Sequence, residues 1–219
     1  SPYQWLAEAL PPGEGSVLDL ACGSAPLASD LSSRGWVGVD LSLAELARAR
    51  PRGGAAMAQA DAAAVPVATS SVPAVVCSMG LMVLQPLPAV AAELVRVLVP
   101  GGTLVALVPA TFPLTMGDVL RTARLLAALS RWRLSYPNED VVRRPRAALA
   151  ALGLQVISDE RRRFVYPVAT RAAAARLVHS LYLPGVGQAQ VADARQVVDR
   201  WVGTEVGVPL RRLVARAPA

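Results

Sequence analysis

Residues 16–40 read SVLDLACGSAPLASDLSSRGWVGVD and contain the pattern that decides the fold. The apolar run 16–20 predicts a short buried parallel strand. The ACGSA that follows predicts a tight turn, in which small side chains let a ligand approach the backbone. A helical stretch comes next, and Gly35 ends it before a second strand over 36–39 that leads to Asp40. The apolar face of that predicted helix comprises Leu27, Ala28 and Leu31.

A strand, a small-residue turn, a helix and a second strand ending in an acid are the parts of a nucleoside site in a doubly wound sheet. Asp40 lies close to the spacing of about 20 residues after the turn at which a carboxylate accepts both ribose hydroxyls. The turn is not G-x-G-x-x-G, and it contains no basic residue to hold a pyrophosphate. A nicotinamide dehydrogenase is therefore disfavoured.

The composition predicts a single folded domain. At 219 residues the chain is long enough for one domain with a full core. Its charged fraction of 17% and its mean hydropathy of +0.40 argue against disorder. Residues 62–92 carry no charge, but prolines interrupt them, so we reject a membrane-spanning helix. Cys22 and Cys77 predict reduced thiols in a cytoplasmic protein, with no disulfide framework and no metal cluster.

Every basic residue except the lone histidine is an arginine, and the arginines are unevenly distributed. Residues 121–176 contain 12 arginines and four acids, a net charge of +8, whereas the remainder of the chain has a net charge of −2. The basic excess therefore lies outside the nucleoside half, where an acceptor would bind.

The rest of the chain continues the alternation of strands and helices. Ser42, with Glu45 three positions later, predicts a capping box at the start of one helix. We expect helices over 2–10, 43–50, 88–98, 114–132, 169–183 and 188–202, a broken helix over 143–152, and strands over 55–60, 73–79, 103–108, 154–165 and 208–215.

Three segments resemble class I S-adenosylmethionine-dependent methyltransferases. Residues 19–25, DLACGSA, are similar to motif I, D-x-G-x-G-x-G, with alanine at two of the glycine positions. Residues 93–102, ELVRVLVPGG, are similar to the family segment E-x-x-R-V-L-x-P-G-G. Asp61-Ala62 matches the acid and small residue that receive adenine in the family. Residues 17–108 thus resemble the cofactor half of methyltransferase type 11 and the ubiquinone/menaquinone C-methyltransferases.

The resemblance implies an α/β, Rossmann-like, doubly wound fold. Its sheet would have seven strands, mostly parallel with an antiparallel last strand, and a helical lid would cover the acceptor. One domain would span 1–219, with a cofactor-binding half at about 13–110. The acceptor or lid elements would lie at about 1–12, 111–150 and 166–205.

The resemblance also implies the residues that bind S-adenosylmethionine. Asp40 would hold the ribose, Asp61 and Ala62 the adenine edge, and residues 21–23 the amino-acid end. Asp19 would organise the loop through hydrogen bonds to backbone groups or to the cofactor amine. The full cofactor set is Asp19, Ala21, Cys22, Gly23, Asp40, Leu41, Asp61, Ala62 and Ser78.

Methyl transfer from a sulfonium is an in-line displacement on an activated carbon, so the protein mainly aligns the nucleophile and excludes water. His179 shares a predicted helical face with Ala172, Ala175 and Tyr182, and it is either a general base or a structural histidine. The candidates for acceptor contact, each of which is alternatively a core residue, are Tyr3, Trp5, Met79, Met82, Phe112 and Tyr182.

These observations predict an enzyme that transfers a methyl group from S-adenosylmethionine to a small, partly apolar molecule and leaves S-adenosylhomocysteine. The basic segment 121–176 leaves RNA as an alternative acceptor. The alanines in motif I leave a catalytically silent S-adenosylmethionine-binding protein as another alternative. A monomer or a homodimer is expected.

Overall fold

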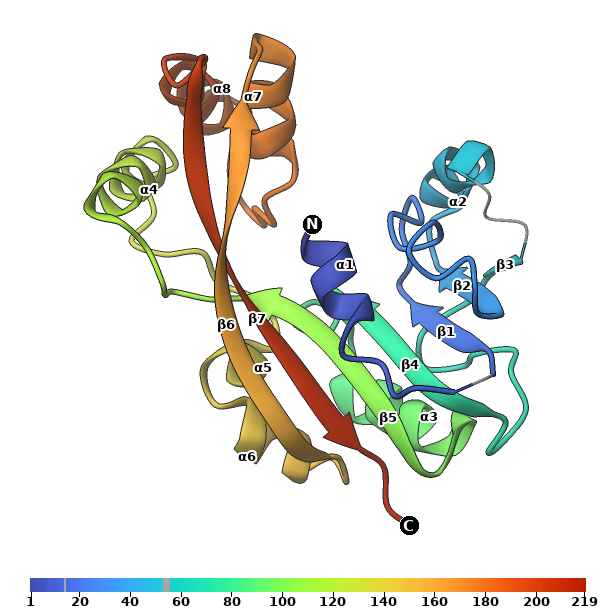
Figure 1. Cartoon of the computed structure of the whole chain (residues 1–219). Helices are drawn as coiled ribbons and strands as arrows, with labels where there is room; N and C mark the ends of the chain where they lie inside the picture. Colours follow the sequence, from blue (N-terminus) through green and yellow to red (C-terminus); the bar gives the residue numbers. More distant parts are fainter. Residues whose placement is uncertain (14, 53–55) are drawn as a thin grey trace. The chain divides into compact units, whose positions relative to one another are not determined.

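The framework of the computed structural model, which describes residues 1–13, 15–52 and 56–219, is a seven-stranded sheet of order β3-β2-β1-β4-β5-β7-β6 (Figure 1). In this order the strands are β3 (Met57–Gln59), β2 (Trp36–Asp40), β1 (Val17–Leu20), β4 (Val72–Ser78), β5 (Leu98–Pro109), β7 (Thr204–Arg216) and β6 (Gln155–Val168). The pairs among β1 to β5 are parallel, and β7 runs antiparallel to its neighbours. The predicted mixed sheet is confirmed.

The chain divides into two compact units. Unit 1 comprises residues 1–109, 137–160 and 211–219, and unit 2 comprises residues 110–136 and 161–210. Strands β6 and β7 each contribute residues to both units. Segments 1–12 and 137–150, which the sequence analysis groups with the acceptor elements, belong to unit 1.

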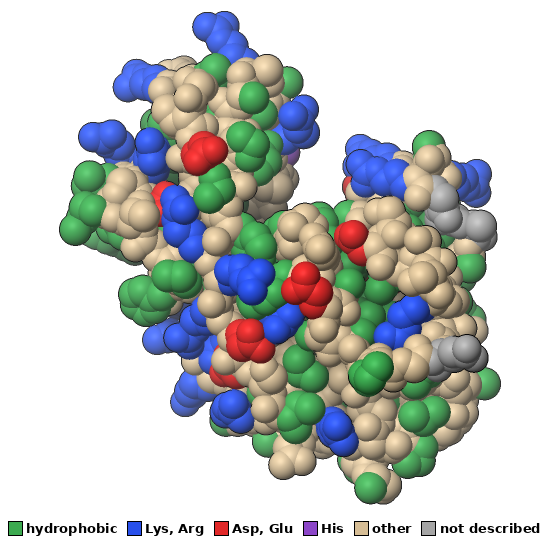
Figure 2. Space-filling view, in the orientation of Figure 1, with side chains coloured by type: hydrophobic (Ala, Val, Ile, Leu, Met, Phe, Trp, Pro, Cys, Tyr) green, Lys and Arg blue, Asp and Glu red, His purple; other side chains and the backbone are tan. Residues whose placement is uncertain are grey.

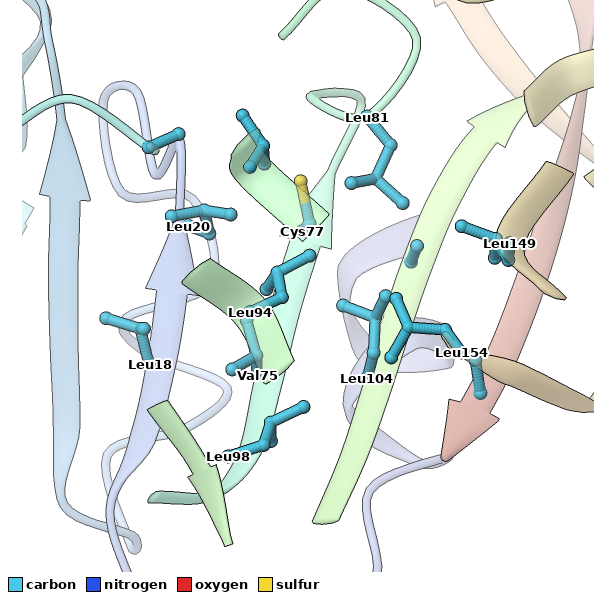
Figure 3. Close-up of a cluster of buried hydrophobic side chains, with 14 of the residues drawn as sticks. Leu18, Leu20, Val75, Cys77, Leu81, Leu94, Leu98, Leu104, Leu149 and Leu154 are labelled. Atoms are coloured by element: carbon cyan, nitrogen blue, oxygen red, sulfur yellow. The ribbon is translucent and has the colours of Figure 1, made fainter. Parts of the chain in front are cut away.

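Unit 1 has an apolar core on one face of its strands. Because β-strand side chains alternate between faces, Leu18 and Leu20 share a face with Val75 and Cys77 of the paired strand β4. Helices α3 (Leu87–Val97), α5 (Glu139–Arg143) and α6 (Pro145–Ala150) supply the other side of this core. Figure 3 shows its members Leu18, Leu20, Val75, Cys77, Leu81, Leu94, Leu98, Leu104, Leu149 and Leu154. The opposite face carries helix α1 (Pro2–Ala7), as Figure 1 shows. Asp19 also belongs to that face, because it alternates with Leu18 and Leu20 along β1.

The helix predicted after the first turn is wrong. Residues 26–34 form successive turns, although Leu27, Ala28 and Leu31 are buried as expected. This stretch is rich in serine, and serine side chains compete with helical hydrogen bonding by bonding to nearby backbone. Ser32 does so, since its hydroxyl donates to the carbonyl of Ser29 at 2.9 Å.

The predicted capping box before α2 (Leu43–Ala49) forms only in part. The Ser42 hydroxyl accepts from the Glu45 N–H, but the Ser42 N–H donates to Asp40 instead of Glu45. The Glu45 carboxylate pairs with Arg48. Asp40 therefore both ends β2 and fixes the entry to α2.

Several predicted boundaries differ from the structure. Strand β5 begins at Leu98 and includes the Pro-Gly-Gly segment, with a register shift opposite Val72 and Ala74. A 3-10 helix η1 (Arg50–Arg52) follows α2, and β3 is shorter than predicted. Residue 55, at the start of that predicted strand, lies outside the described residues.

Unit 2 contains α4 (Met116–Ala128), α7 (Arg171–His179) and α8 (Gln188–Asp199). The prediction that α8 packs on other elements is confirmed, since Ala194, Val198 and Trp201 are buried in a core with residues of α4 and α7. The side chain of Asp118 is fully buried at the start of α4. It accepts from Arg163 Nε at 2.7 Å, from the Gly207 N–H at 2.8 Å and from the Thr115 N–H at 2.9 Å.

Candidate functional site

The carboxyl ends of β1, β2 and β4 meet where the strand order reverses. β1 pairs with β2 on one side and with β4 on the other, so β1 and β4 flank the topological switch point. Ligands of open α/β sheets bind in the crevice outside the strand ends at such a point. The turn after β1, Asp40 at the end of β2 and Ser78 at the end of β4 all lie at this end of the sheet.

The turn after β1 has left-handed backbone at three alternate residues. The φ angles are +56° at Ala21, +53° at Gly23 and +52° at Ala25. These are the positions at which motif I has glycine, and alanine there costs roughly 1–2 kcal/mol of backbone strain. A Cβ placed on Gly23 would meet only a Glu45 carboxylate oxygen, at 4.0 Å. The backbone at Gly23 is therefore open to close approach by a ligand.

Asp40 connects the turn after β1 with the segment between β2 and α2. One carboxylate oxygen accepts from the Gly23 N–H and the other from the Ser42 N–H, both at 2.8 Å. Each oxygen has lone pairs for a further donor. The neighbouring Leu41 is 65% exposed.

Asp19 is a buried carboxyl with one oxygen engaged. Oδ2 accepts from the indole N–H of Trp36 at 3.2 Å, whereas Oδ1 has no hydrogen-bond partner among the residues that the structure describes. Burial raises the pKa of Asp19 to about 7, the Trp36 bond lowers it, and the charge of Asp40 raises it. Within the same residues Asp19 makes no bond to the loop backbone, which leaves the cofactor amine as the other predicted partner. Gly38 makes room for this arrangement, because a Cβ there would lie 2.5 Å from the Trp36 ring.

Arg52, near the turn, was missed in the sequence, whereas Tyr3 was predicted as an acceptor contact. Arg52 donates to the carbonyl of Ser24 at 2.9 Å and to its hydroxyl at 2.7 Å, so a cation does reach the turn, from η1. Burial raises the pKa of Tyr3, with smaller effects of Arg52, which lowers it, and of Asp19, which raises it. The Tyr3 phenol therefore lies within electrostatic range of Arg52 and Asp19.

The E-x-x-R segment of α3 holds the loop that follows Asp61. Glu93 accepts from the Val65 N–H at 2.6 Å, and Arg96 donates to the carbonyls of Val65 and Val67 at 3.1 and 2.8 Å. The Glu93 and Arg96 side chains also pair at 2.7 Å. This segment therefore supports the loop that carries Asp61 and Ala62.

Asp61 starts that loop, and its carboxylate accepts from the Ala63 N–H at 2.9 Å. The Asp61 side chain is exposed, whereas Ala62 is buried. The thiols of Cys22 and Cys77 are buried, and burial raises the pKa of both to about 12. Cys22 is therefore unsuited to act as a nucleophile.

The loop after β4 is held by a residue from a distant segment. Asn138 donates its side-chain amide to the carbonyls of Leu81 and Leu84, each at 2.7 Å, and its N–H to the carbonyl of Met82 at 3.0 Å. Met79 has a φ of +59° and is 37% exposed, whereas Met82 is buried. Asn138 therefore fixes the loop that carries both methionines.

The remaining predicted contact residues are divided between the units. Trp5, in unit 1, is buried with the Arg212 guanidinium 4.6 Å from its ring, as a core residue would be. In unit 2, Phe112 is 65% exposed, and Tyr182 stacks on Tyr136 with 6.0 Å between ring centroids. The shared helical face of His179 and Tyr182 is wrong, because α7 ends at the exposed His179 with a C-cap at Ser180.

Comparisons with known proteins concern the family and the fold of the chain. Residues 18–106 match the family model described as a methyltransferase domain. The [4+2]-cyclase SpnF is 19% identical with a TM-score of 0.63, over 100% of this chain and 81% of SpnF. The YcgJ protein of Bacillus subtilis is 16% identical with a TM-score of 0.60, over 98% and 97% of the two chains.

A third solved structure is a phosphoethanolamine N-methyltransferase of Haemonchus contortus, in complex with phosphomonomethylethanolamine and S-adenosylhomocysteine. It is 16% identical with a TM-score of 0.59, over 100% of this chain and 52% of that enzyme. At these identities the likeness to solved structures shows the fold. No curated protein matches the chain in sequence. Over the described ranges 1–13, 15–52 and 56–219, the helices are too short or too polar to cross a membrane.

Proposed function

We propose that this chain, whose residues 18–106 match the methyltransferase-domain family, is a class I S-adenosylmethionine-dependent methyltransferase that methylates a small, partly apolar molecule. The observation that carries the proposal is the arrangement at the switch point. There Asp40 and the buried Asp19 flank a turn whose backbone is open at Gly23.

The residues present fit S-adenosylmethionine. Asp19 Oδ1 is a buried acceptor that no described residue satisfies, and a buried carboxylate favours a cationic partner such as the cofactor's amine. Asp40 can accept the ribose hydroxyls with its remaining lone pairs. Asp61 and Ala62, with Leu41, would receive the adenine. When bound, the cofactor supplies a methyl group on a sulfonium, which a nucleophile displaces in line.

The protein's own part in transfer is to position the acceptor and to exclude water. We assign Ser78, Met79 and Met82 to the wall beside the reacting atoms, because Ser78 ends β4 at the switch point and both methionines lie in the following loop, which Asn138 fixes. Tyr3 is a further contact candidate, since it lies on α1, which covers the face of the sheet that carries Asp19.

Trp5, Phe112 and Tyr182 remain proposed acceptor contacts. His179 is the proposed base for an acceptor that must lose a proton, because it is the chain's only imidazole.

A small acceptor is supported by the solved relatives. The enzyme of Haemonchus contortus holds phosphomonomethylethanolamine, and the likeness extends over this whole chain. The two cysteines are buried free thiols, as is usual in reducing compartments, and we propose a cytoplasmic location on that ground.

RNA is the second candidate acceptor, because of the net charge of +8 over residues 121–176. Several of these arginines already have partners. Arg163 pairs with Asp118, Arg144 with Asp140, and Arg146 donates to the carbonyl of Val156. Because these arginines already interact within the protein, the small acceptor is favoured over RNA.

The test is a transfer assay with S-adenosylmethionine labelled in its methyl group. We would offer a panel of small amines, phenols and acidic carbon compounds in parallel with total RNA, at low and high salt. Label in a small molecule at both salt concentrations, lost in Asp40→Asn, is expected. Label found only in RNA and lost at high salt would contradict the small acceptor.

A further inference from the structure

Helix α4 has a second apolar face that does not join the core of unit 2. Its inner face places Asp118, Leu125 and Leu129 toward that core. The outer face repeats at the three- and four-residue spacing of one helix side. Together with the segments at either end of α4, it lines a groove of about 590 Å³, formed by Leu114, Val119, Thr122, Ala123, Leu126, Ala127, Ser130, Arg131 and Trp132.

The side chains at this face are unusually exposed for their type. Trp132 is 99% exposed and Met116 is 74% exposed, whereas the other tryptophans are buried: Trp5 at 2%, Trp36 at 9% and Trp201 at 7%. Figure 2 shows hydrophobic side chains gathered over α4. A contiguous exposed apolar patch of this kind marks an interaction site. We call the groove residues together with Met116 and Leu120 the α4 outer face.

The solvent-facing charges of the segment that contains α4, residues 110–136, have one sign. Residues 110–136 contain Arg121, Arg124, Arg131 and Arg133, and the only acid among them is Asp118. Asp118 is fully buried and neutralised by Arg163, so it adds no negative charge to the surface. A second copy would bring the same arginines against one another, which disfavours self-association. An anionic partner fits both features.

We propose that the α4 outer face docks on the surface of an anionic lipid bilayer. A helix that lies on a bilayer presents Trp, Phe and Leu to the acyl boundary and arginines to the headgroups. Trp132 lies between Arg131 and Arg133, which is the arrangement that suits the interface, where an indole sits at headgroup depth. The aliphatic members of the face, Val119 and Leu120, favour lipid over RNA, because bases stack on aromatic rings.

The proposal does not depend on the methyl acceptor, and the protein carries its own probe. Because the other tryptophans are buried, quenching by added acrylamide reports mainly on Trp132. We would measure acrylamide quenching and co-sedimentation of the full chain with phosphatidylcholine vesicles, with and without phosphatidylglycerol. We expect the anionic vesicles to bind the protein about tenfold more tightly than vesicles of phosphatidylcholine alone and to protect Trp132 from the quencher. The protein should dissociate from them at high salt.

Two variants distinguish vesicle binding through the α4 outer face from nonspecific hydrophobic binding. Leu120→Ser combined with Trp132→Ser should weaken co-sedimentation by about tenfold, because it removes the side chains that would enter the acyl boundary. Leu43→Ser is the matched control, because Leu43 is 63% exposed but lies on α2. Equal binding to both vesicle types, equal loss in the control, or Trp132 protected by RNA and not by vesicles would overturn the proposal.

Discussion

Replacing Asp19 with asparagine should make the stability of the protein less dependent on pH. The Asp19 carboxyl is fully buried, and its bond to Trp36 offsets only part of the cost of burial. Asparagine has the same shape, its carbonyl oxygen can accept the same indole N–H, and it does not ionise. The variant therefore removes the charge and keeps the packing.

The size of the effect follows from the pKa. Asp19 has an ordinary pKa of 3.8 in the unfolded chain and a pKa of about 7 in the folded one. Between these values the folded state binds more protons, so stability falls as pH rises, by about 1.4 kcal/mol per pH unit. The loss is absent below the unfolded pKa and complete above pH 7, and it totals on the order of 4 kcal/mol.

The assay is urea unfolding from pH 4.5 to pH 8. In this range Asp118 stays ionised in both states, so it contributes little to the change of stability with pH. From pH 4.5 to pH 8, the free energy of unfolding of the unmodified protein should fall by roughly 3 kcal/mol relative to that of Asp19→Asn. Asp30→Asn, which changes an exposed aspartate, is the matched control. A difference that stays constant with pH would refute the reasoning.

Three further changes test the supports of the fold. Asp118→Asn should cost about 3 kcal/mol in urea unfolding at pH 7. Its carboxylate pKa is lowered, chiefly by Arg163, so this stabilisation should be lost progressively as pH falls from about 4 toward the lowered pKa. A cost that does not decrease below pH 4 would contradict this. Ala21→Gly should raise stability by about 1 kcal/mol, because it relieves a left-handed alanine, and a lower thermal midpoint would argue against strain. Asn138→Ala should speed amide hydrogen exchange over residues 80–85 and cost about 2 kcal/mol, and unchanged exchange would show that the loop does not depend on it.

The elements that the sequence predicts well are those with a strong local signal. The apolar runs of β1, β2 and β4 are buried in the sheet, and Ser42 caps α2, because strand periodicity and caps depend on neighbouring residues. The helix after β1 was predicted from three apolar positions. The serines of the same stretch, residues 29, 32 and 33, compete for the same backbone, which a count of apolar residues does not register.

The site residues that were missed are held by contacts distant in sequence. Arg52 reaches Ser24 across 28 positions, and Asn138 reaches Leu81 across 57. Neither lies in a motif, so no spacing rule indicates them. The bond from Trp36 to Asp19 depends on the parallel register of β1 and β2 and on the small size of Gly38. The left-handed angles of the turn, in contrast, fall at the motif I positions themselves.

The most direct test of the central claim is calorimetric titration of the purified protein with S-adenosylmethionine and S-adenosylhomocysteine. The account predicts saturable binding of both nucleosides, weakened at least about tenfold in Asp40→Asn, because that change removes a charge-assisted acceptor for ribose hydroxyls. Because Asp40 also accepts from the Gly23 and Ser42 N–H groups, urea unfolding of the variant is measured alongside, and titration under conditions in which the variant is fully folded attributes the loss to binding. Absence of binding by well-folded unmodified protein would contradict the cofactor site at Asp19 and Asp40.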